Sequence, residues 1–412
     1  MPPPLLSPLP RRTFDAAQAS DEFSKQWANP GDIFSVLLLL GGDVVNRALA
    51  QLAGTRVSPV AFSFGWVAYA MSAVASAVGE NRLMPPPDCA CKVINAETGH
   101  IRENSSWIIG RIVRDFGSWR HEDVDACVDK LLDLKWEQLR QKAERERPGS
   151  GQHVGRPAQS GLCVSVYKAG DARPRHPGYD LVYLSGILTV FLQLGVAAIP
   201  CGLFGDWSIL LITICGIVLS FAMGYPSQWA KEKWACRTRS KKVVILTRGS
   251  GSQHVIIIIG DGRGLDLEDL ATGPINVDVS TSAFTRLFVI VLAIIWVLLL
   301  ITAAGVHENT WFLLAVGGIG ILQNIFVAAR WRDPAAFGAP LIFDCVFGET
   351  SVMQTLYLME ERYPKSGRNM LETFFPGGME RLSPEERKKW AELEAAAHST
   401  LHIKNVPKTR TT

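Results

Sequence analysis

The chain has 412 residues, 48% of them hydrophobic, and its formal net charge is only +3. A mean hydropathy of +0.14 argues against a disordered chain and fits a protein divided between membrane and water. The basic residues flank apolar stretches, where attraction to anionic lipid headgroups explains them without nucleic acid. We therefore expect the lipid bilayer as a partner and no nucleic acid.

Six apolar stretches are predicted to form transmembrane helices. A hydrocarbon core about 30 Å thick requires about 20 apolar residues in helical form, and the fifth stretch meets this length with Arg286 as its only charge. The first stretch is the weakest, because Asp43, Asn46 and Arg47 lie at its middle, and it either spans the bilayer or lies along the interface. The six stretches are residues 32–53, 59–79, 181–204, 206–224, 284–305 and 310–329.

The distribution of Lys and Arg predicts the orientation of the chain. The short connections 54–58, 205 and 306–309 contain few basic residues, whereas the long aqueous segments contain many of them beside the spans. By the positive-inside rule, the long segments and both termini face the cytosol, and the short connections face the other side.

The expected fold is a mainly α membrane protein with about six transmembrane helices and with cytosolic α+β loops and tail. The predicted segments are a proline-rich N-terminal tail (1–31), the first two membrane helices (32–79), a cytosolic loop with an amphipathic helix (80–180), the third and fourth membrane helices (181–224), a cytosolic loop with a β-hairpin (225–283), the fifth and sixth membrane helices (284–329) and a cytosolic C-terminal tail (330–412).

The aqueous segments carry the signals of an α+β domain. Apolar residues recur at helical spacing over 121–147, which predicts an amphipathic helix. Two β-branched runs, 242–248 and 255–259, flank a glycine-rich turn and predict a hairpin. Because an isolated hairpin is marginal in water, a strand at 162–168 or 341–347 is expected to complete a small sheet.

Two further helices are expected in the tail. One covers 350–362, and the other begins at the capping box Ser383-Pro-Glu-Glu386, with proline at the first helical position.

Polar residues inside the predicted spans are the first candidates for a functional site. Asp43 and Arg47 are four residues apart, so they share a helix face and can pair, with Asn46 beside them. Ionisable residues in a span are functional candidates because burying them unpaired in hydrocarbon is costly, but a pair that locks helix packing is the favoured interpretation here. Three more candidates, assigned to interhelical hydrogen bonding, are Gln193, Gln323 and Asn324.

A glycine-rich segment after the second hairpin strand is the candidate phosphate site. Its glycines can present backbone amides to an anion, although a simple turn explains the same residues better. The candidates are Gly260, Gly262, Arg263 and Gly264. The pair Cys89 and Cys91 provides only two of the four ligands of a structural zinc site, so neither a metal nor a cofactor is predicted.

Several strings along the chain resemble an uncharacterised family of polytopic integral membrane proteins from filamentous fungi. The resemblance implies a membrane protein with sizeable cytosolic parts, and it carries no catalytic residue or cofactor. The strings are Ser20-Asp-Glu-Phe23, Pro30-Gly-Asp-Ile-Phe34, Gly41-Gly-Asp-Val44, Val60-Ala-Phe-Ser-Phe-Gly-Trp66, Val78-Gly-Glu-Asn-Arg82, Lys231-Glu-Lys-Trp234, Leu246-Thr-Arg-Gly249, residues 260–270 and Thr373-Phe-Phe-Pro-Gly377.

The sequence favours a non-catalytic membrane tether whose cytosolic parts bind a protein partner, since no hydrolase signature is present. The alternative is a membrane-embedded enzyme or small transporter, accessory to fungal secondary metabolism, that uses Asp43, Arg47 and the polar residues of the third and sixth spans. A third interpretation makes 260–269 a nucleotide or phosphoinositide sensor.

Overall fold

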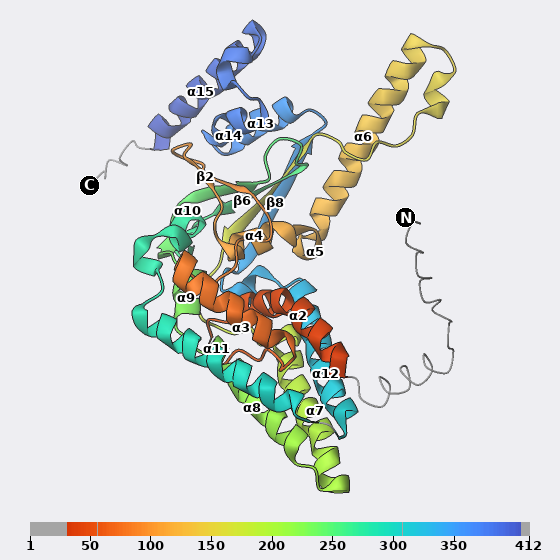
Figure 1. Cartoon of the computed structure of the whole chain (residues 1–412). Coiled ribbons are helices and arrows are strands. Elements are labelled where there is room, and N and C mark those ends of the chain that lie inside the picture. The colour runs from red at the N-terminus through yellow and green to blue at the C-terminus, as the bar shows by residue number, and fades with distance from the viewer. Residues whose placement is uncertain (1–30, 56, 307, 405–412) are drawn as a thin grey trace, which may run out of the picture.

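The computed structural model describes residues 31–55, 57–306 and 308–404, so the predicted proline-rich tail lies outside the described residues except for Gly31. It places a bundle of apolar helices at one end and a β-sheet covered by helices at the other (Figure 1). The bundle contains α2 (Gly31–Leu52), α3 (Gly65–Ala75), α7 (Leu181–Phe204), α8 (Ser208–Gly224), α11 (Ala283–Ala304) and α12 (Thr310–Ala329).

Three of the described helices, α7, α11 and α12, are long and apolar enough to cross a membrane. Their lengths of 24, 22 and 20 residues match the thickness of a hydrocarbon core. The helix α8 is apolar but has only 17 residues, about 26 Å at 1.5 Å per residue. The membrane class is therefore supported by three clear spans within the described chain, and not by the six that the sequence predicts.

The second predicted span, 59–79, is not one helix, and this prediction is wrong. Residues 57–63, called here the non-helical segment, precede α3, which continues into a π-helical turn at Ser76–Glu80. Pro59 has no amide hydrogen and biases Ser58 away from helical angles, so a helix cannot run through this point at low cost. Hydropathy detects the apolar side chains of the segment but not its backbone conformation.

The non-helical segment enters the bundle from the sheet end and reaches its centre. Ser58 donates a hydrogen bond to the carbonyl of Gly224, the last residue of α8, whereas Phe62 packs beside Gly216, two turns earlier in the same helix. The helix α3 then returns the chain to the sheet end. Residues 57–84 therefore form a re-entrant element that enters and leaves the bundle on one side.

The three short connections do not lie together, contrary to the sequence prediction. Asn309 donates to Asp206 at 3.2 Å, which joins the α7–α8 and α11–α12 turns at the far end of the bundle. Gly54 instead lies against Trp234 at the sheet end. The reason is that α2 runs parallel to α12, and its C-terminal end meets the C-terminal end of α12.

The sheet has six strands in the order β2-β1-β5-β6-β3-β8, with only the β3–β6 pair parallel. The predicted hairpin is confirmed, because β5 and β6 pair antiparallel from Val243↔Ile259 to Thr247↔Val255, and both proposed additional strands join it. The strands are β1 (Lys92–Asn95), β2 (Ile101–Glu103), β3 (Leu162–Ala169), β5 (Val243–Thr247), β6 (His254–Ile259) and β8 (Leu341–Glu349), with β4 (Thr238–Ser240) and β7 (Gly264–Leu265) in a separate pair.

The bundle hairpins are insertions between strands of this sheet. The α7–α8 hairpin lies between β3 and β5 in the chain, and the α11–α12 hairpin lies between β6 and β8. Since β3 pairs with both β6 and β8, the two hairpins are held at neighbouring points of one sheet. The sheet therefore positions the ends of all four helices.

Both faces of the sheet are covered, which explains why its central strands are almost entirely apolar. The outer face packs on α13 (Val352–Arg362), α14 (Ser366–Phe374) and α15 (Pro384–Lys404), the last opened by the expected capping box between Ser383 and Glu386. The elements between the sheet and the bundle are α4 (Trp107–Arg114), α5 (Phe116–Trp119), α9 (Gln228–Lys233) and α10 (Leu267–Thr272).

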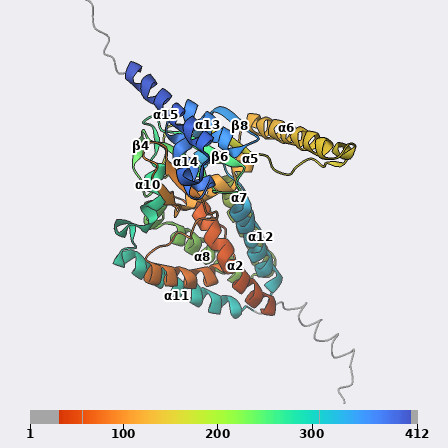
Figure 2. The same ribbon diagram turned by 90° about the horizontal axis from the view of Figure 1, so that it is seen from above.

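The predicted amphipathic helix is confirmed as α6 (Glu122–Glu146), which projects from the body (Figures 1 and 2). Its buried residues, Val124 and Leu131, lie in its first half, where the helix meets β3 and β8. The second half, including Leu134, is largely exposed.

The close approach of the non-helical segment to α12 yields a test with a matched control. A Cβ at Gly320 would lie 1.7 Å from the carbonyl oxygen of Phe62, whereas a Cβ at Gly318 meets nothing within 4 Å. We expect Gly320→Ala to lower the free energy of unfolding by about 1–3 kcal/mol through overpacking, and Gly318→Ala to have little effect. Thermal unfolding in detergent, followed by intrinsic fluorescence, measures both. Equal melting temperatures for the two variants would contradict this packing.

Candidate functional site at the junction of bundle and sheet

Lys233 is the central residue of the junction between the bundle and the sheet. Its side chain is 4% exposed, and its Nζ donates to the carbonyls of Gln51 at 2.9 Å and Ala53 at 3.1 Å. Three aromatic rings surround the ammonium, with Nζ 5.2–5.8 Å from the ring centroids of Trp107, Trp234 and Phe337. Lys233 therefore caps the C-terminal end of α2 inside an aromatic cage.

Arg332, in the connection between α12 and β8, also contacts the C-terminal end of α2. Its guanidinium makes a two-pronged contact with Asp180, the N-cap of α7, at 2.7 and 3.0 Å. It also donates to the carbonyls of Gln51 at 3.1 Å and Pro177 at 3.1 Å. One side chain thus ties together the start of α7 and the end of α2.

Arg111 caps the C-terminal end of α12, as Lys233 caps that of α2. Its guanidinium donates to the carbonyls of Ala328 at 3.1 Å and Arg330 at 2.8 Å, and to Asp88 at 3.0 Å, while Asp115 lies 3.3 Å from its Nε. Only 1% of the side chain is exposed. A helix end presents unpaired carbonyls and the negative end of the helix dipole, so a buried cation there is stabilising.

Glu232, the residue before Lys233 in α9, makes a second contact between this helix and the bundle. The carboxylate of Glu232 accepts hydrogen bonds from the amides of Leu83 at 2.9 Å and Met84 at 2.6 Å, and from Gln228 at 2.7 Å. These bonds fasten the end of the re-entrant element to α9. Neighbouring residues Glu232 and Lys233 therefore attach α9 to two different parts of the bundle.

Burial shifts the pKa values of these two residues in opposite directions. Burial, with Arg332 and Arg111 nearby, lowers the pKa of the Lys233 ammonium well below its usual range. Burial raises the pKa of the Glu232 carboxyl, although the amides of Met84 and Leu83 oppose this effect. Both buried side chains have hydrogen-bond partners, Lys233 on the carbonyls of Gln51 and Ala53 and Glu232 on the amides of Leu83 and Met84.

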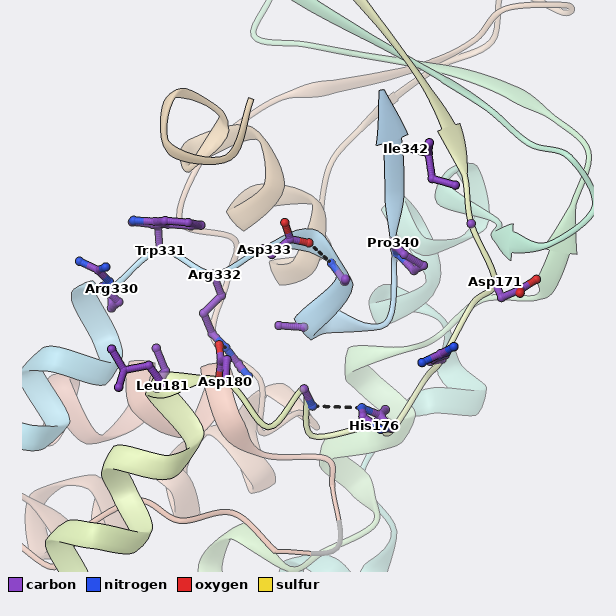
Figure 3. Close-up of a pocket in the computed structure, with 16 residues that line it drawn as sticks. Asp171, His176, Asp180, Leu181, Arg330, Trp331, Arg332, Asp333, Pro340 and Ile342 are labelled. Atoms are coloured by element: carbon purple, nitrogen blue, oxygen red, sulfur yellow. Dashed lines mark hydrogen bonds and ion pairs between the residues drawn. The ribbon is translucent and has the colours of Figure 1, made fainter. Parts of the chain in front are cut away.

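A hollow of about 640 Å³ opens beside this junction (Figure 3). Its wall is formed by residues before α7, by the start of α7 and by the segment from the end of α12 to β8. In Figure 3, Arg332 points toward Asp180 at its base, and Trp331 and Leu181 lie at its edge. Trp331 and Leu181 are both exposed, and exposed aromatic side chains are common where hydrocarbon meets headgroups.

The charges of this hollow compensate one another. Its lining contains three arginines, Arg173, Arg330 and Arg332, and three carboxylates, Asp171, Asp180 and Asp333. The Nδ1 atom of His176 accepts from the amide of Gly178 at 3.2 Å. The arrangement forms a polar surface of mixed sign, in which the Arg332–Asp180 ion pair joins two elements of the fold.

The polar candidates of the predicted third and sixth spans meet at the non-helical segment. Gln193 donates to the carbonyls of Phe62 at 2.6 Å and Val316 at 2.9 Å, and Asn324 donates to the carbonyl of Ala61 at 3.1 Å. Gln323 accepts from the amide of Ala61 at 3.4 Å. These side chains therefore make hydrogen bonds to the backbone of the non-helical segment. The sequence predicted hydrogen bonding between helices for them, but not this partner.

The candidates Asp43 and Arg47 do pair, at 3.1 Å, but on the outer face of α2. Their side chains are 72% and 53% exposed, and Asn46 between them is half-buried. The pair does not face Gln193 or Asn324, so the structure does not bring the predicted intramembrane residues into one site.

The glycine-rich candidate segment uses its amides internally. The amide of Gly260 donates to the carbonyl of Lys242 and that of Gly262 to the carbonyl of Ser240, both at 3.0 Å, and Gly264 pairs with Ser240 in the β4–β7 ladder. The carbonyl of Arg263 accepts from the amide of Ala172 at 2.9 Å. These contacts are those of a structural turn. Within the described residues, no group of three or more His, Cys, Asp or Glu side chains forms a metal site.

The sequence contained a weak signal for the junction residues. Lys233 stands in a basic cluster that the positive-inside rule explains as a set, so its separate role was not predicted. Its neighbours Trp229 and Trp234 were the available clue, because two tryptophans within six residues mark an apolar contact and not an open loop.

Comparisons of the chain with protein-family models, with curated proteins and with solved structures found no match. The resemblance to a fungal family of polytopic membrane proteins therefore stays a prediction, and the site has to be interpreted from its own geometry.

Replacing Lys233 tests the junction directly. We expect Lys233→Met to lower the free energy of unfolding by about 1–3 kcal/mol, because the carbonyl of Ala53 loses its side-chain donor and stays buried. Lys231→Met removes the same charge from an exposed position on α9 and should leave stability unchanged. Thermal unfolding in nanodiscs compares the two. A Lys233→Met variant as stable as the Lys231→Met control would show that the cap is dispensable.

Proposed function

We propose that the protein is a multi-pass integral membrane tether that holds a rigid α+β domain at one face of a bilayer, where the domain binds a soluble protein partner. The carrying observation is the buried capping of α2 by Lys233. A flexible tether needs only a linker, whereas this chain buries three basic side chains, Lys233, Arg332 and Arg111, against the helix ends beside its sheet domain.

The proposed topology places the sheet in the cytosol. The basic residues of the α8–β5 connection, including Lys231, Arg237 and Lys242, lie at the sheet end, as the positive-inside rule requires of a cytosolic face. The parallel course of α2 and α12 supports a topology in which α2 starts at the opposite face. This differs from the sequence prediction that both termini are cytosolic.

The alternative, an embedded enzyme or small transporter, has less support. Its ionisable candidates Asp43 and Arg47 face outward from the bundle. Its polar candidates Gln193 and Asn324 are occupied by backbone carbonyls. Arg47 lies five residues before the end of α2, about 7.5 Å along the axis, so its long side chain can reach toward the interface.

Epitope tags at the two ends of the chain test the proposed topology. In sealed microsomes treated with protease from the cytosolic side, we expect the C-terminal tag to be digested and the N-terminal tag to be protected. The reason is that α2 approaches the sheet from the far end of the bundle. Digestion of both tags would instead place both ends in the cytosol and would contradict a crossing by α2.

Native mass spectrometry of the chain in its own lipids tests the proposed tether. We expect one soluble protein bound at a fixed stoichiometry, and we expect the double variant Asp43→Leu, Arg47→Leu to fold and to retain it, because the pair is exposed and neutral as a unit. A lone chain carrying a small molecule that the double variant loses would overturn the proposal and favour the enzyme or transporter.

A further inference from the structure

A second hollow, of about 520 Å³, lies on the sheet domain between α4–α5 and the β5–β6 turn. This hollow is called here the arginine pocket. The hollow beside Lys233 and Arg332 is lined by both arginines and aspartates, whereas the charged residues described in the lining of the arginine pocket are all basic. Its lining includes Arg114, Arg120, Arg248 and His254, and it contains no Asp or Glu among the described residues. A pocket of this size accepts a small organic molecule and not only a single ion.

Arg248 is the one lining arginine without a carboxylate partner in the described part of the chain. Arg114 contacts Asp88 and Asp115, and Arg120 pairs with Asp125. Arg248 is exposed, and its guanidinium donates only to the carbonyl of Val113, at 3.2 Å. Its positive charge is therefore uncompensated, and most of its five N–H donors remain available.

The wall of the pocket contains further donors without acceptors. The Nη1 atom of Arg120 lies 3.1 Å from Nε2 of His254, and because a guanidinium only donates, the histidine proton must be on Nδ1. That Nδ1 atom and the Nε atom of Arg120 are buried with no partner among the described residues. Both atoms are therefore hydrogen-bond donors in the wall of the pocket for which the described chain provides no acceptor.

The glycine-rich β5–β6 turn closes one side of the pocket. The amides of Gly249, Ser252 and His254 are used within the turn, whereas those of Ser250 and Gly251 have no partner in the described chain. Both residues line the pocket and are exposed. Adjacent free amides beside an arginine form an anion-binding arrangement.

The floor of the pocket is apolar. It contains Val113, Phe116, Leu246 and Ile256, all of them buried side chains. Phe116 meets His254 edge to face, with 5.3 Å between ring centroids. A ligand that fills the pocket therefore combines an anionic group with an apolar or flat body.

We propose that the arginine pocket binds an organic phosphate, whose phosphate group contacts Arg248 and the Ser250–Gly251 amides while its body lies over Phe116 and Leu246. Phosphate suits this site because a guanidinium recognises its oxygens in a two-pronged geometry. The phosphate is provided either by a soluble phosphomonoester or by a phosphorylated lipid headgroup, since the sheet domain stands next to the bundle. The inference does not depend on the proposed tethering of a protein partner.

Binding measurements on the full chain in nanodiscs test this site. The probes are adenosine monophosphate, adenosine and inorganic phosphate, each titrated by isothermal calorimetry in neutral-lipid nanodiscs. We expect saturable binding of adenosine monophosphate, weaker binding of inorganic phosphate and none of adenosine. A repeat in nanodiscs that contain phosphatidylinositol 4-phosphate separates the sources, because a lipid occupant would abolish the binding of the soluble probe.

Arg248→Ala should weaken the binding of the phosphate probe by about 10- to 100-fold, the value of a charge-assisted hydrogen-bonding group. Arg248→Lys should lose less, because it keeps the charge. Arg145→Ala removes an exposed arginine from the projecting part of α6 and should leave affinity unchanged. Equal affinity of Arg248→Ala and Arg145→Ala, adenosine binding as well as its monophosphate, or no saturable binding of any phosphate would overturn the proposal. Melting temperatures show that each variant is folded.

Discussion

A backbone carbonyl that is removed from water without a donor costs about 1–3 kcal/mol, and this constraint accounts for the unusual polar contacts of the molecule. It acts at two places. In the bundle, the carbonyls of Ala61 and Phe62 in the non-helical segment have side-chain donors. Trp66 and Asn324 donate to Ala61, and Gln193 donates to Phe62. At the junction, α2 and α12 end inside the protein, and buried cations supply the donors.

The same contacts determine how the molecule can move. Transporters that alternate between two open states move one group of helices relative to another around a central site. Here both helical hairpins begin and end at one sheet, and Arg332 connects the start of α7 to the end of α2. Separation of these elements would break the hydrogen bonds of Arg332 to Asp180 or to Gln51 and would leave donors of a buried guanidinium unpaired. These contacts favour a fixed arrangement of the bundle and the sheet domain, which fits the proposed role of holding the sheet domain at the membrane.

The sequence predicted most elements correctly, for identifiable reasons. The amphipathic spacing of α6, the β-branched runs of β5 and β6 and the Ser383 capping box are local signals, and the structure confirms each. The apolar helices α7, α11 and α12 follow from composition and length alone.

Two features were not predictable from local signals. Hydropathy does not distinguish an apolar helix from an apolar non-helical segment, so the stretch after Pro59 was assigned as a span. Similarly, a run of basic residues has the same composition whether its members face headgroups or cap a buried helix. Lys231 and Lys233 are two residues apart, yet one is exposed and the other is buried, because α9 turns them to different sides. Only tertiary packing separates their roles.

The location of uncompensated charge, and not the number of basic residues, decides what the sheet domain can bind. The glycine-rich segment after β6 has acidic neighbours, but Asp266, Glu268 and Asp269 all pair with cations. Lys242 contacts all three, Arg237 contacts Asp266 and Asp269, and Arg102 contacts Glu268. Arg239, Lys241 and Arg263 are exposed at that end without a carboxylate partner among the described residues, but the amides of Gly260 and Gly262 beside them are used within the turn. At the opposite end of the β5–β6 hairpin, Arg248 has only a backbone contact. An anionic ligand gains most where an unpaired cation and free amides line the same pocket, which is why the proposed phosphate site is at the turn between β5 and β6.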